Sequence, residues 1–280
     1  MTVIRRGICL LLCMILLFTQ SAAACAEEEY PGTATGVLDA RELTERVEAI
    51  LAQYGVDGSQ IAVGFYYTGT GDTYFYRGDS WIYSASLYKV PMYMALDNEA
   101  AAGKIRESGT FPTLSVLDAC RDRVLINSVN STAQSLMGHF GSREECRKAY
   151  RTVSTLPEDY YQTCFYRQSY FTARFMTDVM TWLYNHSEEY AKTLDSLYRS
   201  PLREDLASVG ENYAIAQKYG DYNNQNVDVH NVAAIIDTPT PIVVVVMTEW
   251  MPKHRSVMNA IATMLTDYAL QLDEQLAADK

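Results

Sequence analysis

A serine and a lysine three residues apart begin an apolar stretch that continues through Leu96. This stretch predicts a buried helix, and residues three apart share a helix face, so the amine of Lys89 can reach the hydroxyl of Ser86. A serine becomes a nucleophile when a nearby base takes its proton, and a lysine can be that base when burial or positive charge lowers its pKa. The N–H groups at a helix start can also stabilise an oxyanion. Taken alone, this spacing occurs by chance, and a surface serine at a helix cap is the simpler interpretation.

Two further polar sets follow in order along the chain. Ser128-Val129-Asn130 opens a predicted helix in the middle section, and Lys218-Tyr219-Gly220 ends a predicted strand near the C-terminus. Together with Ser86 and Lys89, they resemble the S-x-x-K, S-D-N and K-T-G set of class A β-lactamases and penicillin-binding proteins. The resemblance extends from about residue 39 to the end of the chain.

The resemblance implies a role for each matching side chain. Ser86 would attack a carbonyl carbon and become acylated, while Lys89 would take its proton directly or through a water. Ser128 would relay a proton to the leaving nitrogen, and Asn130 would bind the side-chain amide of the substrate. Lys218 would hold Ser128 and supply positive potential for a substrate carboxylate. A helix-capping role remains the alternative for Ser128 and Asn130.

The same resemblance places substrate-binding backbone at the third set. Tyr219, Gly220 and Asp221 would line the substrate, and the N–H groups of Ser86 and Asp221 would form the oxyanion hole. The resemblance implies no cofactor and no metal, and the four histidines show no metal-ligand spacing.

The sequence departs from the class A pattern in the segment that should promote deacylation. No E-x-x-L-N occurs in residues 154–169, where that motif is expected, and Glu158 is the one glutamate there. Glu158 could substitute, although its flanking residues do not match and a solvated loop acid is the alternative. We therefore expect slow deacylation.

Other departures lie in the substrate-binding motifs. Val129 replaces the aspartate of S-D-N, and Tyr219 replaces the hydroxyl residue of K-T-G with a much larger side chain. Asp221 adds negative charge beside the same pocket. His230 lies roughly where some relatives place an arginine that binds carboxylate, with a structural histidine as the alternative. These changes put the recognition of ordinary β-lactams in doubt.

The periodicity around the motifs predicts an α/β (α+β) fold. We expect an antiparallel five-stranded sheet flanked by the terminal helices, with an all-helical lobe of about residues 97–210 inserted and a cleft between the two lobes. Asp39 and Gly55 should bound the first helix. The predicted strands cover residues 61–67, 73–76, 213–218, 231–236 and 242–248.

The N-terminus has the pattern of an export signal. Arg5 and Arg6 precede an apolar run that ends at Phe18, followed by small residues through Ala26. Cleavage after Ala26 would release a secreted protein, whereas cleavage before Cys25 would leave a lipid-anchored one. An uncleaved anchor is the third alternative. We divide the chain into a signal peptide (1–26), a flexible lead-in (27–38) and a catalytic domain (39–280).

The charge and the cysteines limit the partners. The formal net charge of −11 becomes −13 once residues 1–26, with two basic and no acidic residues, are removed. This excess argues against nucleic acid and against an anionic membrane surface as partners, and it says little about a small substrate. The resemblance implies a small-molecule or peptidoglycan-peptide substrate, and we expect a monomer. Cys120, Cys146 and Cys164 permit one disulfide and one free thiol, or serve as buried apolar side chains.

The sequence therefore favours an extracytoplasmic serine hydrolase that forms an acyl-enzyme with a β-lactam or a D-alanyl peptide. A binding or sensor module without turnover is one alternative. An esterase or amidase with a non-β-lactam substrate is another.

Overall fold

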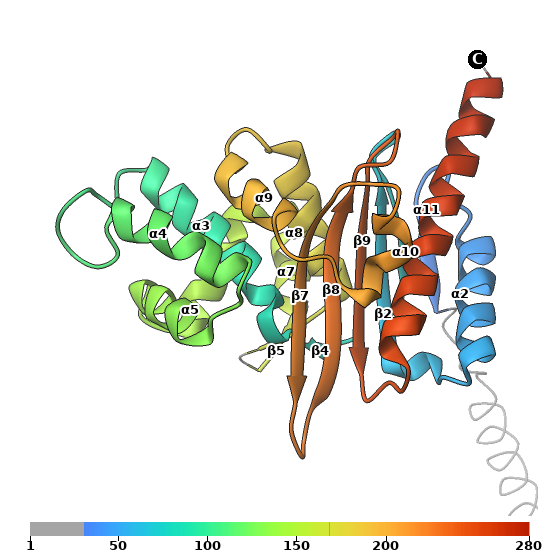
Figure 1. Ribbon diagram of the computed structural model, residues 1–280, viewed down its shortest axis with the longest axis horizontal. Helices are drawn as coiled ribbons and strands as arrows, with labels where there is room; N and C mark the ends of the chain where they lie inside the picture. Colours follow the sequence, from blue (N-terminus) through green and yellow to red (C-terminus); the bar gives the residue numbers. More distant parts are fainter. Residues whose placement is uncertain (1–30, 168, 280) are drawn as a thin grey trace, which may run out of the picture. The chain divides into compact units, whose positions relative to one another are not determined.

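A six-stranded antiparallel sheet runs through the structure, a computed structural model that describes residues 31–167 and 169–279 (Figure 1). Its order is β1-β3-β2-β9-β8-β7. The strands are β1 (Gly32–Ala34), β2 (Ile61–Tyr67), β3 (Asp72–Tyr76), β7 (Ile215–Asn223), β8 (Asp228–Ile236) and β9 (Ile242–Glu249). The β-branched run of β9 lies centrally, where Val246 pairs with Val63 on one side and Val232 on the other. Buried on both faces, such strands favour valine and isoleucine.

The sheet has one strand more than the five predicted. The additional strand, β1, pairs with β3 and lies in the segment predicted as a flexible lead-in, so that prediction is wrong for residues 32–34. Three residues are too few to show an alternating pattern. A Cβ at Gly32 would lie 1.8 Å from Thr44 Oγ1, so glycine lets this strand pack against the first helix. The predicted signal peptide and Cys25 lie outside the described residues.

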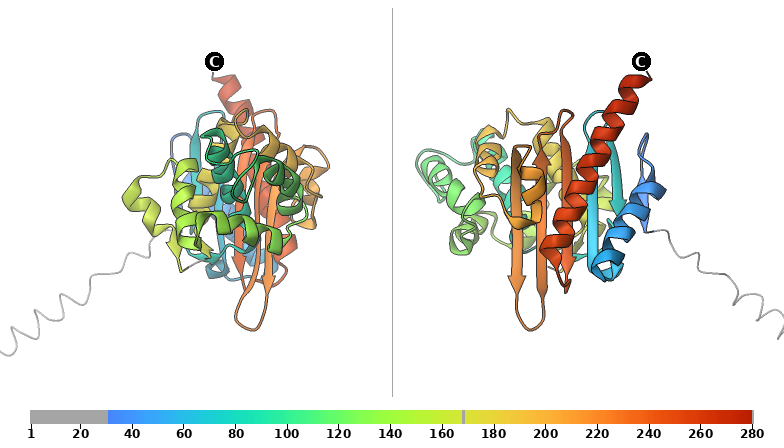
Figure 2. Two further views of the ribbon diagram at one scale, coloured as in Figure 1. Left: turned by 90° about the vertical axis from the view of Figure 1, so that its left-hand side faces the viewer. Right: turned by 45° about the vertical axis from the view of Figure 1, so that its right-hand side comes forward.

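The terminal helices cover one face of the sheet, as predicted (Figure 2). They are α2 (Ala40–Tyr54) and α11 (His254–Ala278), with the short α10 (Ala207–Gly210) beside α11. The carboxylate of Asp39 accepts hydrogen bonds from the N–H groups of Arg41 and Glu42, and Gly55 ends α2 in the left-handed conformation. Both predicted ends of this helix are therefore confirmed.

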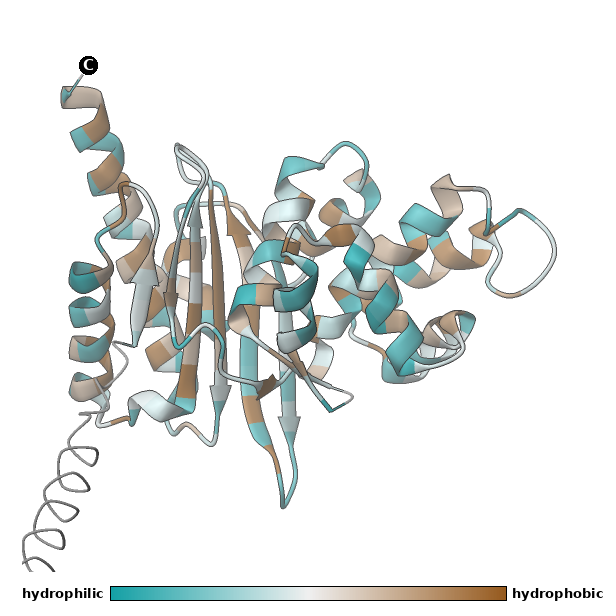
Figure 3. Ribbon diagram, turned by 180° about the vertical axis from the view of Figure 1, so that it is seen from behind, coloured by the Kyte–Doolittle hydropathy of each residue, from teal (hydrophilic) through white to brown (hydrophobic). Residues whose placement is uncertain are grey.

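The helical lobe lies on the opposite side of the sheet from α2 and α11 (Figures 1 and 2). Helix α8 packs directly on β2, β8 and β9. Strand faces and inward helix faces are largely hydrophobic, while the outer faces of the helices are more hydrophilic (Figure 3). The helices on this side are α3 (Lys89–Ala101), α4 (Leu114–Leu125), α5 (Asn130–Met137), α6 (Arg143–Tyr150), α7 (Glu158–Thr163), α8 (Ala173–Asn185) and α9 (Ala191–Tyr198).

The segment 154–169, where the E-x-x-L-N motif is expected, contains regular structure. It holds α7 and β5 (Phe165–Tyr166), which pairs with β6 (Tyr170–Phe171). Strand β6 also pairs with β4 (Ile82–Tyr83), which leads directly to Ser86. Two-residue strands have no periodicity to detect, so the sequence pattern does not reveal them. The small sheet joins the segment to the backbone that carries the nucleophile.

The thiols of Cys120, Cys146 and Cys164 are free, and the latter two are buried in the core. Burial raises the pKa of the Cys146 thiol to about 12, so it remains a protonated apolar side chain. No helix in the described part of the chain has the length and apolar character needed to span a membrane.

Candidate active site

Ser86 lies in a single turn of 3₁₀-helix, η2 (Ala85–Tyr88), between β4 and α3. Ala85 has a positive φ of 45°, an uncommon conformation for a residue with a side chain. Leu87 is fully buried and anchors this turn. The strained backbone and the buried anchor together hold the serine in a fixed position.

Lys89 begins α3, and its side chain is completely buried. Its Nζ lies 2.9 Å from Ser86 Oγ, 3.0 Å from Ser128 Oγ and 2.7 Å from Asn130 Oδ1, and it also contacts the carbonyl oxygen of Ser128 at 2.7 Å. Within residues 31–167 and 169–279, no carboxylate pairs with it. Burial lowers the pKa of Lys89 to about 8, because these neutral oxygens do not replace the water that a charged amine loses. The amine is therefore able to become a neutral base near physiological pH.

Ser128 immediately precedes the N-cap of α5 and has a positive φ of 55°. Its hydroxyl lies between two amines, 3.0 Å from Lys89 Nζ and 3.1 Å from Lys218 Nζ. Val129 occupies the N-cap and makes no side-chain cap. The hydrogen bonds of the Ser128 and Asn130 side chains go to the lysines, which favours the functional interpretation over the capping alternative.

Lys218 lies within β7 and is fully buried. Its Nζ contacts Ser128 Oγ and the carbonyl oxygen of Tyr219 at 3.0 Å. Burial, then the positive charges of Lys89 and Arg203, lower its pKa to about 7. The strand predicted at residues 213–218 has wrong bounds, because β7 begins at Ile215 and continues to Asn223. Its last three residues are exposed and polar, and so lack the apolar pattern of a buried strand.

Gly220 lets β7 approach the nucleophile turn. A Cβ at this position would lie 2.7 Å from the carbonyl oxygen of Ser84 and 3.0 Å from the backbone nitrogen of Ser86. Any side chain here would force the two backbones apart. The backbone of Asp221 therefore follows directly on the point where β7 contacts the serine turn, which is the arrangement that the predicted oxyanion hole requires.

The Tyr219 ring lies between two cationic side chains. Lys218 Nζ is 4.0 Å from the ring centroid and Arg203 Cζ is 4.4 Å from it. Arg203 also forms ion pairs with Asp221 and with Asp205, the latter at 3.5 Å. The positive charge of Arg203, beside Tyr219, is thus already neutralised inside the protein. Arg203 carries no motif in the sequence, and its role is visible only in three dimensions.

His230 contacts the same cluster. Its Nδ1 lies 3.2 Å from Asp221 Oδ1 and its Nε2 lies 3.3 Å from an oxygen of Asp228, while its ring stacks on His254 at 3.4 Å between centroids. These contacts hold Asp221 between an arginine and a histidine. They agree with the structural alternative for His230.

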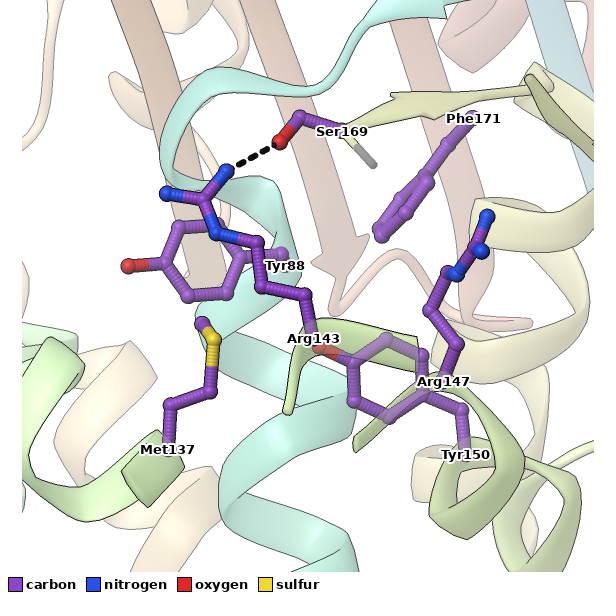
Figure 4. A pocket seen from close by; sticks show the side chains of 7 residues that line it. All are labelled: Tyr88, Met137, Arg143, Arg147, Tyr150, Ser169 and Phe171. Carbon is purple, nitrogen blue, oxygen red and sulfur yellow. Dashed lines mark hydrogen bonds between the residues drawn. The ribbon is translucent and has the colours of Figure 1, made fainter. Parts of the chain in front are cut away.

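A small pocket beside the nucleophile turn is lined by two arginines and by no acid (Figure 4). Arg143 donates from Nη1 to Ser169 Oγ at 2.8 Å, and the carbonyl oxygen of Ser169 accepts a hydrogen bond from Ser84 N at 2.8 Å. In the described residues, Arg143 has no carboxylate partner. The pocket is lined by Tyr88, Met137, Arg143, Arg147, Tyr150, Ser169 and Phe171.

Glu158 makes its contacts elsewhere. Its carboxylate pairs with Arg151 Nε at 3.0 Å and accepts a hydrogen bond from Gln162 at 2.7 Å, and 66% of its side chain is exposed. This is the environment of a solvated loop acid. No cluster of histidine, cysteine and acidic side chains in the described part of the chain is arranged to hold a metal ion.

The chain belongs to the β-lactamase enzyme family, whose Beta-lactamase2 model matches residues 42–116 and 116–269. The fold and family therefore define a divergent class A β-lactamase-like serine hydrolase, and the predicted fold class is confirmed. No curated protein sequence matches the chain.

Solved structures of class A β-lactamases share this fold. An ancestral class A β-lactamase (GNCA) is 17% identical with a TM-score of 0.65, over 81% of this chain and 99% of its own. A β-lactamase from Desulfarculus baarsii is 16% identical with a TM-score of 0.64, over 82% and 98%. One from Xanthomonas campestris is 17% identical with a TM-score of 0.63, over 81% and 97%. At these identities the likeness concerns the fold.

Proposed function

We propose that this serine hydrolase is exported, forms an acyl-enzyme at Ser86 with a β-lactam or a D-alanyl peptide, and releases the acyl group slowly. The observation that carries the proposal is the contact of 2.9 Å between Lys89 Nζ and Ser86 Oγ, made by a buried amine whose pKa is lowered to about 8. Acyl transfer to a serine requires at least a nucleophile and a base within hydrogen-bond distance of each other.

Acylation follows from these contacts. The neutral amine of Lys89 accepts the proton of Ser86 Oγ as that oxygen bonds to the carbonyl carbon, and the carbonyl oxygen becomes an oxyanion held by backbone N–H groups. Ser128 Oγ, which lies between the two lysines, gives its proton to the leaving nitrogen and is reprotonated from Lys89. The carbon–nitrogen bond breaks, and the acyl group remains on Ser86.

Deacylation needs a base for the attacking water. The pocket beside Ser86 presents Arg143 and Ser169, while Glu158 is paired with Arg151 at the surface. In the described residues no carboxylate forms a hydrogen bond or ion pair with Ser86 or Lys89, so the base that this proposal assigns to the water is Lys89 itself. This arrangement supports an acyl-enzyme that accumulates faster than it hydrolyses.

Intact-protein mass spectrometry after incubation with labelled penicillin tests this proposal. We expect one adduct on the parent chain, none on Ser86→Ala, and an adduct that persists for many minutes after excess label is removed. The absence of an adduct on the parent, or an adduct that survives in Ser86→Ala, would reject acylation at Ser86. Turnover at ordinary β-lactamase rates would reject slow release of the acyl group and would make Glu158 the candidate base for deacylation.

An esterase or amidase acting on substrates without a carboxylate is the second candidate. It is favoured by Arg203, whose charge is neutralised by Asp221 and Asp205, and by the Tyr219 ring that covers Lys218. Both features leave little free positive charge for a substrate carboxylate. Labelling of Ser86 by a fluorophosphonate but not by penicillin would select this candidate.

A sensor module remains the alternative from a different class. It would be supported by an acylated Ser86 with no hydrolysis in any substrate panel. Export, either as a secreted protein or anchored through Cys25, is part of the proposal. The mass of the mature N-terminus tests it, and an intact Met1 would contradict both processed forms.

A further inference from the structure

Five aromatic side chains contact one another in a continuous series beside the nucleophile turn. Ring centroids are 5.1 Å apart for the first pair, then 5.8 Å, 5.6 Å and 5.3 Å along the series. We call this series the aromatic ladder, and its members in order are Trp81, Tyr166, Tyr170, Tyr83 and Tyr222.

The inner end of the ladder adjoins the catalytic residues. Tyr83 is the last residue of β4, three positions before Ser86, and its carbonyl oxygen accepts a hydrogen bond from Asn231 Nδ2 at 2.9 Å. Tyr222 follows Asp221 on β7. A ligand whose reacting group lies at Ser86 can therefore extend from the site directly onto these rings.

The outer end of the ladder is open and held in place. Trp81 and Tyr166 are 47% and 42% exposed, yet they stack on each other at an interplanar angle of 20°. Trp81 Nε1 donates a hydrogen bond to the carbonyl oxygen of Thr163 at 2.7 Å, which fixes the indole ring. Two large rings arranged in advance of binding lose little conformational entropy when a ligand covers them.

The chemistry of the ladder selects its ligand. The ladder exposes large parts of Trp81, Tyr166 and Tyr222, and in the described residues the hydroxyls of Tyr166 and Tyr170 have no hydrogen-bond partner. A pyranose ring offers the complement, with apolar C–H faces and hydroxyl edges. Nucleic acid would also stack on aromatic rings, but the net charge of −11 opposes a polyanion. The spacing of adjacent ring centres is comparable with the length of one sugar unit.

We propose that the aromatic ladder binds a carbohydrate chain, with the sugar units leading away from Ser86. This inference rests on the proposed function and extends it, because it assigns the enzyme a polymeric substrate whose reactive peptide or ester is attached to a glycan. Binding to the ladder would then deliver the scissile group to Ser86.

The experiment uses the chain with Ser86→Ala, so that binding is measured without acylation. N-acetylglucosamine oligomers of one to six units are titrated while tryptophan fluorescence and calorimetric heat are recorded. We expect saturable binding that strengthens with oligomer length, and at least tenfold weaker binding of the hexamer in Trp81→Ala and Tyr166→Ala. Trp250→Ala is the matched control, since Trp250 is equally exposed, at 48%, and is not a member of the ladder.

Each outcome decides between the possibilities. The proposal is overturned if the hexamer does not bind, if affinity is independent of length, or if Trp250→Ala weakens binding as much as Trp81→Ala. Equal binding of a stem peptide with and without attached sugars would assign the ladder to peptide and likewise overturn it. Fluorophosphonate labelling of the parent chain is measured separately, so failure of acylation at Ser86 is distinguishable from failure of carbohydrate binding. Circular dichroism of both Trp81→Ala and Tyr166→Ala checks that neither variant has a folding defect.

Discussion

Two buried amines share one hydroxyl beside Ser86. Lys89 and Lys218 both contact Ser128 Oγ, and both are fully buried among neutral partners. In the described residues, neither amine forms an ion pair with a carboxylate, and the charge of Asp221 only partly offsets the lowering of the Lys218 pKa. Burial therefore dominates, and it lowers the pKa of Lys89 to about 8 and that of Lys218 to about 7. A buried Lys89 amine without a paired carboxylate thus loses its proton more easily, which is the property that the proposed base needs.

This arrangement predicts how the rate of acylation depends on pH. The neutral form of Lys89 is the reactive one, so the rate should rise with pH and level off above about 8, where the amine is deprotonated. Below that value the rate should fall about tenfold for each pH unit, because the neutral fraction falls in proportion. The measurement is the rate of fluorophosphonate labelling of Ser86 between pH 5.5 and 9.5. This reaction has no leaving nitrogen for Ser128 to protonate, so its pH dependence reports on the base alone.

Lys218→Met supplies the control for this profile. Because Lys218, with a pKa of about 7, is neutral before Lys89 titrates, and because burial is what lowers the pKa of Lys89, the labelling rate should rise over the same pH range in this variant. A labelling rate that is flat between pH 6 and 8 in the parent chain would contradict the assignment of Lys89 as the base. A pH profile that moves to higher pH in Lys218→Met would show that a positive charge on Lys218, and not burial, lowers the pKa of Lys89.

At the residue scale, the sequence identified the side chains that meet around Ser86. Spacing or motif signals mark Lys89, Ser128 and Lys218. In the structure both lysine amines lie within 3.1 Å of Ser128 Oγ, and Lys89 Nζ also lies 2.9 Å from Ser86 Oγ. Arg203 and Arg143 were missed because each reaches the site from a loop or helix without a motif. Their partners, Tyr219 and Ser169, are 16 and 26 residues away, and only the fold defines such contacts.

The element that sets the geometry of the site is β7. It is the edge strand of the sheet, and it contacts the nucleophile turn through Gly220, where the backbones of Ser84 and Ser86 leave no space for a Cβ. The φ of Gly220 is not in the left-handed region, so its requirement for glycine comes from close approach and not from backbone conformation. β7 and η2 can therefore approach this closely only because residue 220 has no Cβ.

Gly220→Ala should separate these two elements. The added Cβ would meet backbone atoms at 2.7 and 3.0 Å, so we expect a loss of about 1–3 kcal/mol in the free energy of unfolding. Labelling of Ser86 should slow by about 100-fold, since small displacements of a reacting group cost this much. Urea denaturation and labelling kinetics provide the two readouts.

Gly138→Ala is the matched control for that substitution. Gly138 begins the 3₁₀-turn η3 (Gly138–Phe140) after α5, and a Cβ there would meet nothing within 4 Å. We expect its stability to stay the same or increase by about 0.5 kcal/mol, with unchanged labelling. If Gly220→Ala labels Ser86 at the parental rate, close approach of β7 is not what positions the serine.

The longer elements were predicted from their periodicity, and the shortest were not. Helix α2 and strands β2 and β9 have strong apolar patterns and turn or cap signals at their ends. β1, β4, β5 and β6 have two or three residues each, and they exist because neighbouring strands offer free hydrogen-bonding edges. β7 extends beyond its predicted end for a similar reason, since pairing with β8 continues after the buried residues stop.

At the scale of the whole molecule, the sheet separates two hydrophobic cores. One core lies between the sheet and helices α2 and α11, and the other joins the opposite sheet face to the helical lobe. Phe175 of α8 belongs to the second core. Its ring contacts those of Tyr150, Tyr161, Phe165 and Phe171, with centroids 4.8 to 6.2 Å apart. A helix packed on the sheet is thereby joined to α6, α7 and the small sheet, so the two lobes should unfold together.

Phe175→Ala tests whether the lobes form one cooperative unit. Removing this fully buried ring should cost about 3–5 kcal/mol and lower the melting temperature by about 10 °C, while the calorimetric transition stays single. Since Phe165 and Phe171 lie in the strands next to Tyr166 and Tyr170, the variant should also weaken hexasaccharide binding to the aromatic ladder. Phe111→Ala, which removes a ring that is 48% exposed, should change neither property. Two calorimetric transitions in the parent chain would show that the helical lobe folds independently of the sheet. So would a Phe175→Ala variant in which only one of two transitions has a lowered melting temperature.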